Sequence, residues 1–560
     1  MHIACKYSSD RVFKLLIESE KIKLEHLTNP TFDHLPLHSA CRSIVERCDI
    51  VEALLQRIIE LKLNKMLRVH LNLNLRIKLV KRLLPMVINR FDLSTQAIEE
   101  QFNQKEFILN KFEFIKVLDE TSYFLKEIVN RKDSCNNRPL QLAVEQDYLN
   151  LVNLLFKYGA LSMLFSTNRN LPIHIAAKIG SIEMFNLLEQ QNSISFKSNS
   201  SMENLFHIAA FHNNIEFLKT ACEYYIKKYD SLKNYKEFKY ALEAVNNNYL
   251  TPLFLAASKS NTECVRILIE MKPLSKYYLD DYNRNIFHIC CLYNSYHTLK
   301  YLIDHIDNKM LLHHQQSEKS KLYSSNPLLS ESSKDENLST HLNRRTKSFL
   351  IEKIEEQAEK EVPEEHIGVK IADLESAINN SRNLTDFNVL YMSSESNENL
   401  SEYELFKNML YQLDSNYNTI LHMGAYKKSV RTLNLIFYLI IDSRVVFEKL
   451  YKKKNVNGET FFQLACNHGC IEIVELVLKN KHSLMHNYDP LNDCDNNLNS
   501  PLLSAVSANQ YRCVCLLLEH GANVNCENHN KQNALHLSCL IGSYEIAEVL
   551  IRYIFKVVYK

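Results

Sequence analysis

Apolar and polar positions follow a pattern along this chain that returns after 33 residues in its clearest copies. Residues 171–177 are Leu-Pro-Ile-His-Ile-Ala-Ala, and residues 204–210 are Asn-Leu-Phe-His-Ile-Ala-Ala. A second stretch with apolar residues at helical spacing follows each such phrase, as at Ile473, Val474, Leu476, Val477 and Leu478. The pattern predicts pairs of antiparallel helices, each pair joined to the next by a loop.

The position held by His174 recurs from one end of the chain to the other. Most intervals between copies are 32 to 47 residues, and the aligned residues are His2, His38, Gln141, His174, His207, Phe254, His288, His422, Gln463, Ser504 and His536. This period is typical of ankyrin repeats, so the chain is identified as an all-α ankyrin-repeat solenoid with about eleven helix-turn-helix repeats and short hairpin-like loops. Stability is then shared between neighbours, because one repeat cannot bury its apolar stripe alone.

Local signals mark where the helices begin and end. Pro252 follows Thr251 and Pro501 follows Ser500, so a hydroxyl can cap the helix while proline takes its first position. Gly521 follows a second helix and is expected to be the left-handed residue that ends it. Most copies lack this glycine, so other helices are expected to end on Asn or Lys.

The repeated histidines are predicted to be structural. Neighbouring repeats keep equivalent positions far apart, so these imidazoles cannot converge on one metal ion or substrate. Each lies near a helix start, where its ring can bond to turn backbone and hold adjacent repeats together. The prediction covers His38, His174, His207, His288, His422 and His536.

Two interruptions divide the chain into five segments. Residues 1–60, 134–312 and 404–560 are expected to form ankyrin repeats, with the first repeat incomplete. Residues 61–133 are a helical insertion or degenerate repeats, and residues 313–403 are rich in Ser, Asn, Glu and Lys and are expected to be disordered. Both ends have the pattern of a truncated array, although an unusually apolar pair of natural caps is the alternative.

Each interruption contains one candidate for regulation. Basic residues alternate with leucines between positions 62 and 82, and such a helix can touch anionic lipid or a calmodulin-like partner, although a solvated helix face is favoured. In the second interruption, Ser348 follows Arg344, Arg345 and Lys347, which suits a basophilic kinase. A chance basic string in a disordered segment is the alternative.

Composition argues against an enzyme. The chain has eight glycines, the closest pair being eleven residues apart, so no Gly-x-Gly-x-x-Gly or phosphate-binding loop exists. No histidine precedes a glutamate, which excludes the His-Glu-x-x-His zinc motif. No catalytic residue, cofactor or metal is therefore expected, and an enzyme hidden in residues 39–140 is the remaining alternative.

The net charge of +1 gives no reason to expect nucleic acid as a partner, and no apolar run is long enough to cross a membrane. The fifteen cysteines are expected to be reduced and buried, as at Cys264 and Cys539. Cys466 and Cys470 flank His468 without the spacing of a zinc site. Redox sensing at Cys470, Cys513 or Cys515 would require an exposed thiol.

Two regions resemble the repeats of transient receptor potential cation channels of subfamily A. These regions are residues 500–507, 515–518 and 533–537, and residues 251–258 and 283–288. The resemblance implies the cytosolic region of a calcium-permeable, sensory, homotetrameric channel. The chain lacks the pore helices of that family, so a free-standing cytoplasmic adaptor or scaffold is the alternative.

Either function implies that the partner is another protein or another part of a longer chain. Recognition is expected on a concave face built from the loops and first helices. Candidate contacts are the loop residues Asn168, Arg169, Asn170, Asn247, Asn248 and Tyr249, for which an ordinary solvated turn is the alternative.

Overall fold

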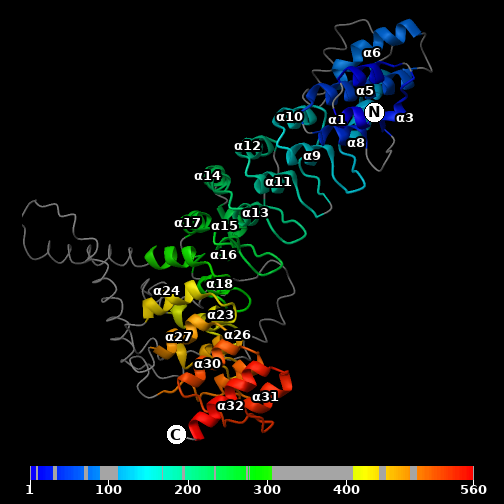
Figure 1. The fold of residues 1–560 in the computed structure, drawn as a ribbon. Coiled ribbons are helices and arrows are strands. Elements are labelled where there is room, and N and C mark those ends of the chain that lie inside the picture. The colour runs from blue at the N-terminus through cyan, green and yellow to red at the C-terminus, as the bar shows by residue number, and fades with distance from the viewer. Residues whose placement is uncertain are drawn as a thin grey trace, which may run out of the picture. The chain divides into compact units, whose positions relative to one another are not determined.

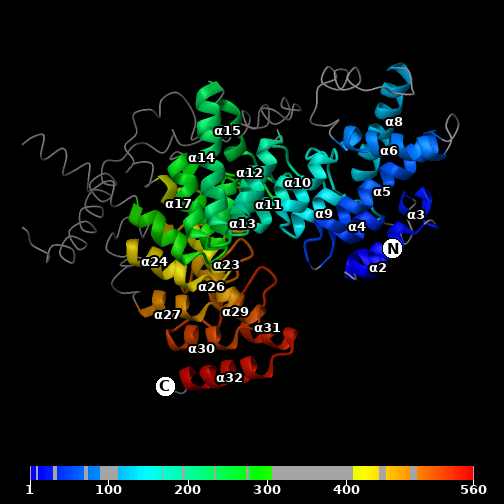
Figure 2. The same cartoon turned by 90° about the horizontal axis from the view of Figure 1, so that it is seen from above.

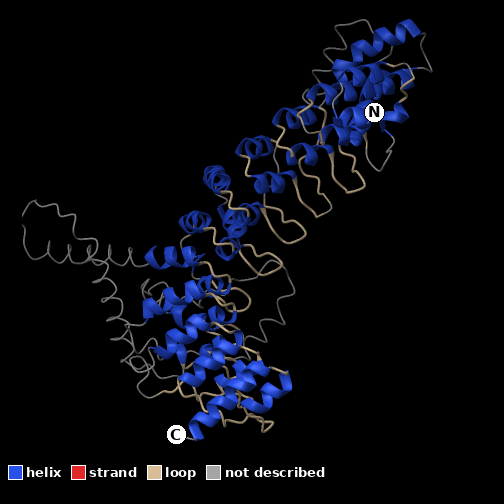
Figure 3. Cartoon of the chain, in the orientation of Figure 1, coloured by secondary structure: helices blue, strands red, loops and turns tan. Residues whose placement is uncertain are grey.

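A computed structural model describes residues 2–7, 10–19, 21–28, 35–43, 45–67, 73–88, 111–166, 168–191, 196–232, 235–272, 275–276, 278–305, 408–440, 450–479 and 488–558. These residues form helices and loops without a strand, as Figure 3 shows. The expected all-α class is therefore confirmed. The predicted disordered segment 313–403, with Ser348, lies outside the described residues.

The chain divides into two compact units, and the first covers Met1–Pro252. In this unit α9, α11 and α13 form one row, and α10, α12 and α14 form a second row behind it (Figure 1). The helices of the unit are α1 (His2–Tyr7), α2 (Asp10–Glu18), α3 (Leu24–Thr28), α4 (Pro36–Cys41), α5 (Cys48–Leu67), α6 (Leu73–Ile88), α8 (Lys111–Val129), α9 (Pro139–Glu145), α10 (Leu149–Lys157), α11 (Pro172–Ile179), α12 (Ile182–Gln190), α13 (Leu205–Phe211), α14 (Ile215–Leu232) and α15 (Tyr235–Glu243).

The second unit covers Leu253–Lys560. In each hairpin we call the N-terminal helix the first helix and the C-terminal helix the second helix. The first helices α23, α26, α29 and α31 of this unit pack on one another in succession (Figure 2). Its helices are α16 (Pro252–Ser258), which begins at the boundary, α17 (Thr262–Met271), α18 (Ile286–Leu292), α23 (Ile420–Tyr426), α24 (Val430–Ile440), α26 (Phe461–His468), α27 (Ile471–Lys479), α29 (Pro501–Ser507), α30 (Tyr511–Glu519), α31 (Ala534–Ile541) and α32 (Tyr544–Val558).

The first helices begin in one of two ways. Asn204, Asn285 and Thr419 cap α13, α18 and α23 with a side-chain oxygen that accepts a backbone N–H of the first turn. Leu35, Arg138 and Leu171 provide no such bond, and proline follows each of them at the first helical position. Proline has no N–H to satisfy there, so it replaces the missing cap. Pro501 is the first residue of α29, where Ser500 also accepts from the Leu503 amide.

Small buried residues let the first helix lie close to its neighbours. The fifth residue of each is small and buried at Ala143, Ala176, Ala209, Ala256, Ala465 and Ala505. Gly424 occupies the same position in α23, and a Cβ atom there would lie 2.5 Å from Cδ2 of the buried Leu433 in α24. Side chains larger than alanine would therefore separate the two helices of a hairpin.

A left-handed residue turns the chain between the two helices of each hairpin. Gly180, Gly469 and Gly542 follow α11, α26 and α31 with φ of 87°, 69° and 71°. In the other hairpins non-glycine residues take this conformation, namely Asp147, Asn213, Ser260, Asn294, Lys428 and Asn509. Most of these are Asn or Asp, whose short polar side chains tolerate the left-handed region.

The interval between His38 and Gln141 does not break the array. Helix α4 packs on α9, and Arg42 of the α4 hairpin forms an ion pair with buried Asp133 at 2.9 Å. Helices α5, α6 and α8 pack on one another within this interval. In the predicted basic stretch, Lys62 lies with its Nζ atom 4.6 Å from the centre of the Phe124 ring.

The second interval is bridged in the same way. Helix α18 packs on α23, although the sequence between them contains residues 306–407. The Nδ2 of Asn285 donates to the Met409 carbonyl at 2.7 Å, and the Ser415 amide donates to the Tyr282 carbonyl at 2.8 Å. The hairpins on either side of this interval are therefore direct neighbours.

Candidate functional site

Eight of the loops that precede a first helix have an Asp or Asn at the same position, and its side chain closes the loop. Six positions before helices α9, α13, α16, α18, α23, α26, α29 and α31 stands an Asp or Asn, namely Asp133, Asn199, Asn246, Asp280, Asp414, Asn455, Asp495 and Asn528. At Asp414 the Oδ1 atom accepts from the amides of Asn416 and Asn418 at 2.9 and 2.7 Å. This Asx turn holds the loop in one conformation without regular secondary structure.

Each loop has a left-handed tip and bonds to the next loop. The tip lies three positions before the first helix, with φ of 57° at Tyr417, 75° at Gly458 and 60° at Leu498. The Val456 amide donates to the Asn416 carbonyl at 3.0 Å, and the Asn496 amide donates to the Asn457 carbonyl at 3.0 Å. Consecutive loops of the second unit therefore form a hydrogen-bonded row (Figure 3).

The repeated imidazole links a first helix to the loop of the next repeat. In α11 the Leu171 amide donates to Nδ1 of His174 at 3.2 Å, and Nε2 lies 2.8 Å from the Lys197 carbonyl. In α23 the Thr419 amide donates to Nδ1 of His422 at 3.2 Å, and Nε2 lies 3.0 Å from the Glu459 carbonyl. A neutral ring with its proton on Nε2 satisfies both bonds.

The other predicted histidines occupy equivalent places with one exception. The Nε2 atoms of His38, His207 and His288 lie 2.9, 3.2 and 3.4 Å from the carbonyls of Arg131, Leu250 and Asn418. His536 is exposed, and only its Nδ1 is bonded, by the Asn533 amide at 3.2 Å. The structure therefore brings no two of these rings together, and each ring except that of His536 contacts backbone of the neighbouring repeat.

Glutamine makes the same link where histidine is absent. The Oε1 atom of Gln141 accepts from the Arg138 amide at 3.0 Å, and its Nε2 donates to the Leu164 carbonyl at 2.9 Å. The Nε2 of Gln463 donates to the Asn499 carbonyl at 2.7 Å. Gln463 makes only the second of these bonds, because its buried Oε1 has no hydrogen-bond partner in the described part of the chain. The donor to the loop of the next repeat is therefore common to both glutamines, and charge has no part in it.

Burial keeps these imidazoles neutral. It lowers the pKa of His174, His207 and His422 to about 4, and that of His288 to about 3. The charged form would lose its hydration inside the repeat stack, and the bond to a carbonyl recovers only part of that loss. Acid should therefore weaken the stack.

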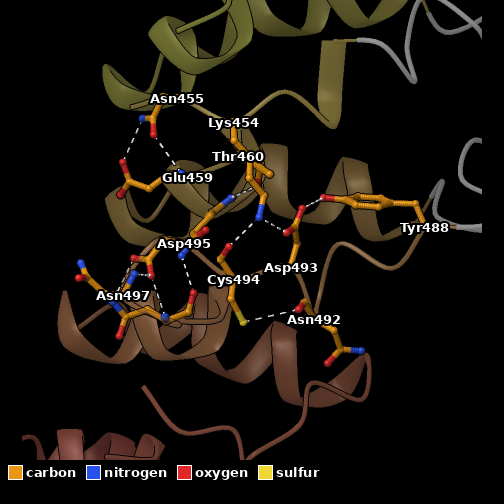
Figure 4. A network of polar contacts seen from close by, with 12 residues as sticks. Lys454, Asn455, Glu459, Thr460, Tyr488, Asn492, Asp493, Cys494, Asp495 and Asn497 are labelled. Carbon is orange, nitrogen blue, oxygen red and sulfur yellow. Dashed lines mark hydrogen bonds and ion pairs between the residues drawn. The ribbon is translucent and has the colours of Figure 1, made fainter. Parts of the chain in front are cut away.

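A polar network in the second unit fixes two adjacent loops (Figure 4). The Nζ atom of Lys454 lies 2.6 Å from the Asp493 carboxylate and donates to the Cys494 carbonyl at 2.7 Å. The Tyr488 hydroxyl donates to the same carboxylate, which together with burial raises the pKa of Tyr488 well above its usual value. The network stabilises the contact between the two loops, because Lys454 of one loop bonds to Asp493 and Cys494 of the other.

We expect the Asx turn to contribute strongly to stability. Asp414→Ala should lower the free energy of unfolding by about 1 to 2 kcal/mol, because the amides of exposed Asn416 and half-buried Asn418 lose their acceptor. The double change Asp414→Asn with Asn418→Glu copies the pair Asn455 and Glu459, in which Nδ2 donates to the carboxylate at 3.1 Å. It should recover most of the loss. Urea unfolding followed by circular dichroism measures both, and equal loss in both variants would contradict this role.

Four exposed tyrosines lie on two consecutive repeats of the second unit. Tyr282 and Tyr417 are on loops, and Tyr293 and Tyr426 follow or end the first helices α18 and α23. Their side chains are 46% to 53% exposed. We call these four residues the tyrosine cluster. Tyrosine is enriched at protein interfaces because its ring is rigid and largely apolar while its hydroxyl is polar.

The loop residues predicted as contacts are also at the surface, in the first unit. Arg169 and Tyr249 are left-handed tips with φ of 54° and 59°. The Asn168 carbonyl and the Asn247 amide bond to the loop that contains Ser200 and Ser201, at 2.9 and 3.0 Å. These asparagines therefore join loops, and Tyr249 is the member of this set with an exposed ring.

Burial differs among the cysteines. Cys470 and Cys513 are buried, which raises the pKa of each thiol to about 11 and disfavours the thiolate needed for redox sensing. Cys515 is half-buried. The prediction that Cys539 is buried is wrong, because no described hairpin covers its side of α31.

Pro252 and Gly521 lie at the ends of helices, and Cys466 and His468 lie in α26. Pro252 is the first residue of α16. Gly521 comes directly after the C-cap residue His520 of α30, with φ of 85°. Cys466 is buried in α26, while His468 meets the ring of Tyr426 edge-on at 4.9 Å.

Sequence reasoning missed the Asx turns and the tyrosine cluster. The Asp or Asn six positions before each first helix recurs at the repeat interval, so aligning the copies on their loops would have found it. Among the described residues, no group of three or more His, Cys, Asp or Glu is arranged to hold a metal ion. None of the helices in that part of the chain is long and apolar enough to span a membrane.

A family model described as ankyrin repeats (3 copies) matches residues 221–311 and 399–528. The chain is 30% identical over 140 residues to the B-cell lymphoma 3 protein homolog of Mus musculus, covering 25% of this chain and 29% of that protein. It is 32% identical over 109 residues to the transient receptor potential cation channel subfamily A member 1 of Homo sapiens, covering 19% and 9%. The matches thus span less than a third of either relative. With these matches and its repeated helical hairpins, the chain contains ankyrin repeats.

Proposed function

We propose that this chain is a non-catalytic binding array whose tyrosine cluster recognises another protein segment. The observation that carries the proposal is the placement of four half-exposed tyrosines on loops and helix ends of adjacent repeats. Asx turns and loop-to-loop bonds fix the backbone under the loop tyrosines, so little conformational entropy is lost when a partner binds. Ankyrin repeats are protein interaction modules, which agrees with this use of the surface.

We further propose that the array is the repeat region of a subfamily A cation channel. The matching human channel and the repeat motifs at residues 251–288 and 500–537 support this context. The array would then lie at the cytosolic face of a membrane and belong to a homotetramer. The match to the B-cell lymphoma 3 homolog favours a second candidate, a free-standing cytoplasmic scaffold.

The complete transcript separates these two contexts. A reading frame that continues into a linker and six apolar segments supports the channel. A reading frame without membrane-spanning segments contradicts the channel and supports the free-standing scaffold. The binding role proposed for the tyrosine cluster is tested separately.

Tyrosine truncation tests the binding role. The double variant Tyr417→Ala with Tyr426→Ala should weaken partner binding by about 30-fold or more, because interface tyrosines often contribute 2 kcal/mol or more when truncated. Partners captured with the native chain would be titrated against both proteins by biolayer interferometry.

Tyr511→Ala is the matched control. Tyr511 is 45% exposed and lies on the second helix α30. The control should bind within about twofold of the native chain, and the helical circular dichroism of both variants should be unchanged. Equal binding by the double variant and the native chain would contradict the proposal.

A further inference from the structure

The ends of the first helices α16 and α23 in the second unit carry lysines and no carboxylates. Residues 258–261 and 426–429 contain Lys259, Lys427 and Lys428, and neither Asp nor Glu. Residues 145–148, at the end of α9 in the first unit, contain Glu145 and Asp147 instead. The basic character is therefore local, because the whole chain has a net charge of only +1.

The cations gather beside one tyrosine. The Nζ atom of Lys427 lies 4.9 Å from the centre of the Tyr426 ring, and the centre of the His468 ring also lies 4.9 Å from it. Lys427 and Lys428 are exposed, and neither forms an ion pair within the described part of the chain. Burial, and after it the charges of Lys428 and Lys427, lower the pKa of His468.

Two carboxylates act near these residues, Glu459 on His468 and Glu472 on the Cys470 thiol that Lys428 also affects. Glu459 raises the pKa of His468 in part, against the stronger effects of burial and Lys428. Its Oε2 atom already accepts from the Nδ2 atoms of Asn455 and Asn457, at 3.1 and 3.3 Å. Glu459 therefore bonds within its own loop and forms no ion pair with Lys427 or Lys428 among the described residues. The charges of the two lysines stay available to a partner.

We propose that Tyr426, Lys427, Lys428 and His468, here called the basic corner, bind an acidic segment of a partner protein. Carboxylates of that segment would meet the two lysines, and its aromatic or apolar side chains would pack on Tyr417 and Val456 of the adjacent loops. Both loop side chains are more than half exposed, at 53% and 54%. The inference rests on the proposed function and specifies the chemistry of the partner.

The distances suit a short extended segment. Helix α23 has seven residues and is thus about 10 Å long, which separates the loop before it from the basic corner. An extended peptide covers this length with about three or four residues. Charge complementarity at such a site favours fast and selective association with acidic sequences.

The experiment uses the full chain and three labelled probes, one of which is duplex DNA. The first probe is a random copolymer of glutamate and tyrosine, and the second is a random copolymer of lysine and tyrosine of the same length. Fluorescence anisotropy would be measured for the native chain, for Lys427→Glu with Lys428→Glu, and for Lys479→Glu. Lys479 is 71% exposed on the second helix α27 and serves as the matched control.

The acidic copolymer should bind the native chain, and the double charge reversal should weaken it at least tenfold. The control variant should stay within twofold, and binding should weaken as salt increases. Equal binding of the basic copolymer, equal weakening by the control, or equally tight binding of duplex DNA would overturn the proposal. If the chain self-associates and this displaces the acidic probe, the proposal is overturned too, because a second copy of the chain then occupies the basic corner.

The two proposals fail in different ways. If the tyrosine variants lose a captured partner while the charge reversal leaves that partner bound, the basic corner is not the acidic site and the binding array stands. If both sets of variants bind as the native chain does, the binding array itself is contradicted.

Discussion

Replacing His174 or His422 with glutamine should leave the stability at pH 7.5 nearly unchanged and raise it at pH 5.0. Burial lowers the pKa of each ring to about 4 in the folded chain, whereas an unfolded histidine has a pKa of about 6.5. Between these values the unfolded chain takes up a proton that the folded chain does not. Stability is therefore full above pH 6.5 and is lost as the pH falls towards 4.

The size of the effect follows from the pKa difference. At pH 5.0 each such histidine costs about 2 kcal/mol of unfolding free energy, and glutamine removes that cost because it does not titrate. Glutamine should keep the link itself, since Gln141 makes both bonds in α9. Gln463→His makes the reverse change and should introduce acid sensitivity at the same position.

Urea unfolding at the two pH values measures these differences. Circular dichroism at 222 nm is the suitable signal, because the chain has no tryptophan. If His422→Gln lost several kcal/mol at pH 7.5, the position would need more than one donor and one acceptor. If the native chain and both glutamine variants lost equal stability at pH 5.0, neutral burial of these rings would be contradicted.

Gly458→Ala should cost about 3 kcal/mol, and Gly521→Ala should cost about 1 kcal/mol. Both glycines are left-handed, with φ of 75° and 85°, so both alanines carry the same backbone strain. A Cβ atom on Gly458 would also lie 2.7 Å from the backbone nitrogen of Asn496, which donates to Asn457. A Cβ atom on Gly521 would meet nothing within 4 Å.

The difference between these variants isolates the contact between loops. Urea unfolding gives both losses, and hydrogen exchange at the Asn496 amide reports whether its bond to Asn457 has opened. Faster exchange is expected in Gly458→Ala alone. Equal losses of unfolding free energy in the two variants would show that backbone strain accounts for the whole loss. The hydrogen-bonded row of loops would then add no stability.

The helices were predictable from sequence because their signals are local. Proline at a first helical position, small residues such as Ala176 and Ala209, and apolar spacing in the second helices all lie within a few residues of one another. Each of these features fixes a dihedral angle or a packing distance on its own. The period then assigned every such feature to the same place in a repeat.

The contacts between repeats were only partly predictable. The sequence placed His174 near a helix start but did not indicate Lys197 as its partner, since the two are 23 residues apart. The direct packing of α4 on α9 and of α18 on α23 also had no local signal. These contacts depend on the path that each long insertion takes away from the repeats and back. No single turn or helix determines that path.

The candidate site was the least predictable part. Asn168 and Asn247 were two of the six loop residues predicted as contacts, and the structure uses their backbone to join loops. The tyrosine cluster depends on which residue of each loop is left-handed and on how far its ring extends from the row. Tyr417 and Tyr426 are nine residues apart, and their sequence neighbours alone do not show that both are exposed.

The account rests on a neutral imidazole that bonds its own helix start through Nδ1 and the next repeat through Nε2. Imidazole nitrogen resonances of the full chain labelled with nitrogen-15 histidine test this directly, with His174 and His422 assigned through their glutamine variants. We predict that at pH 5.5 both rings are neutral, with the proton on Nε2 and slow exchange of that proton. Resonances of a charged ring, or of a neutral ring with its proton on Nδ1, would contradict the account.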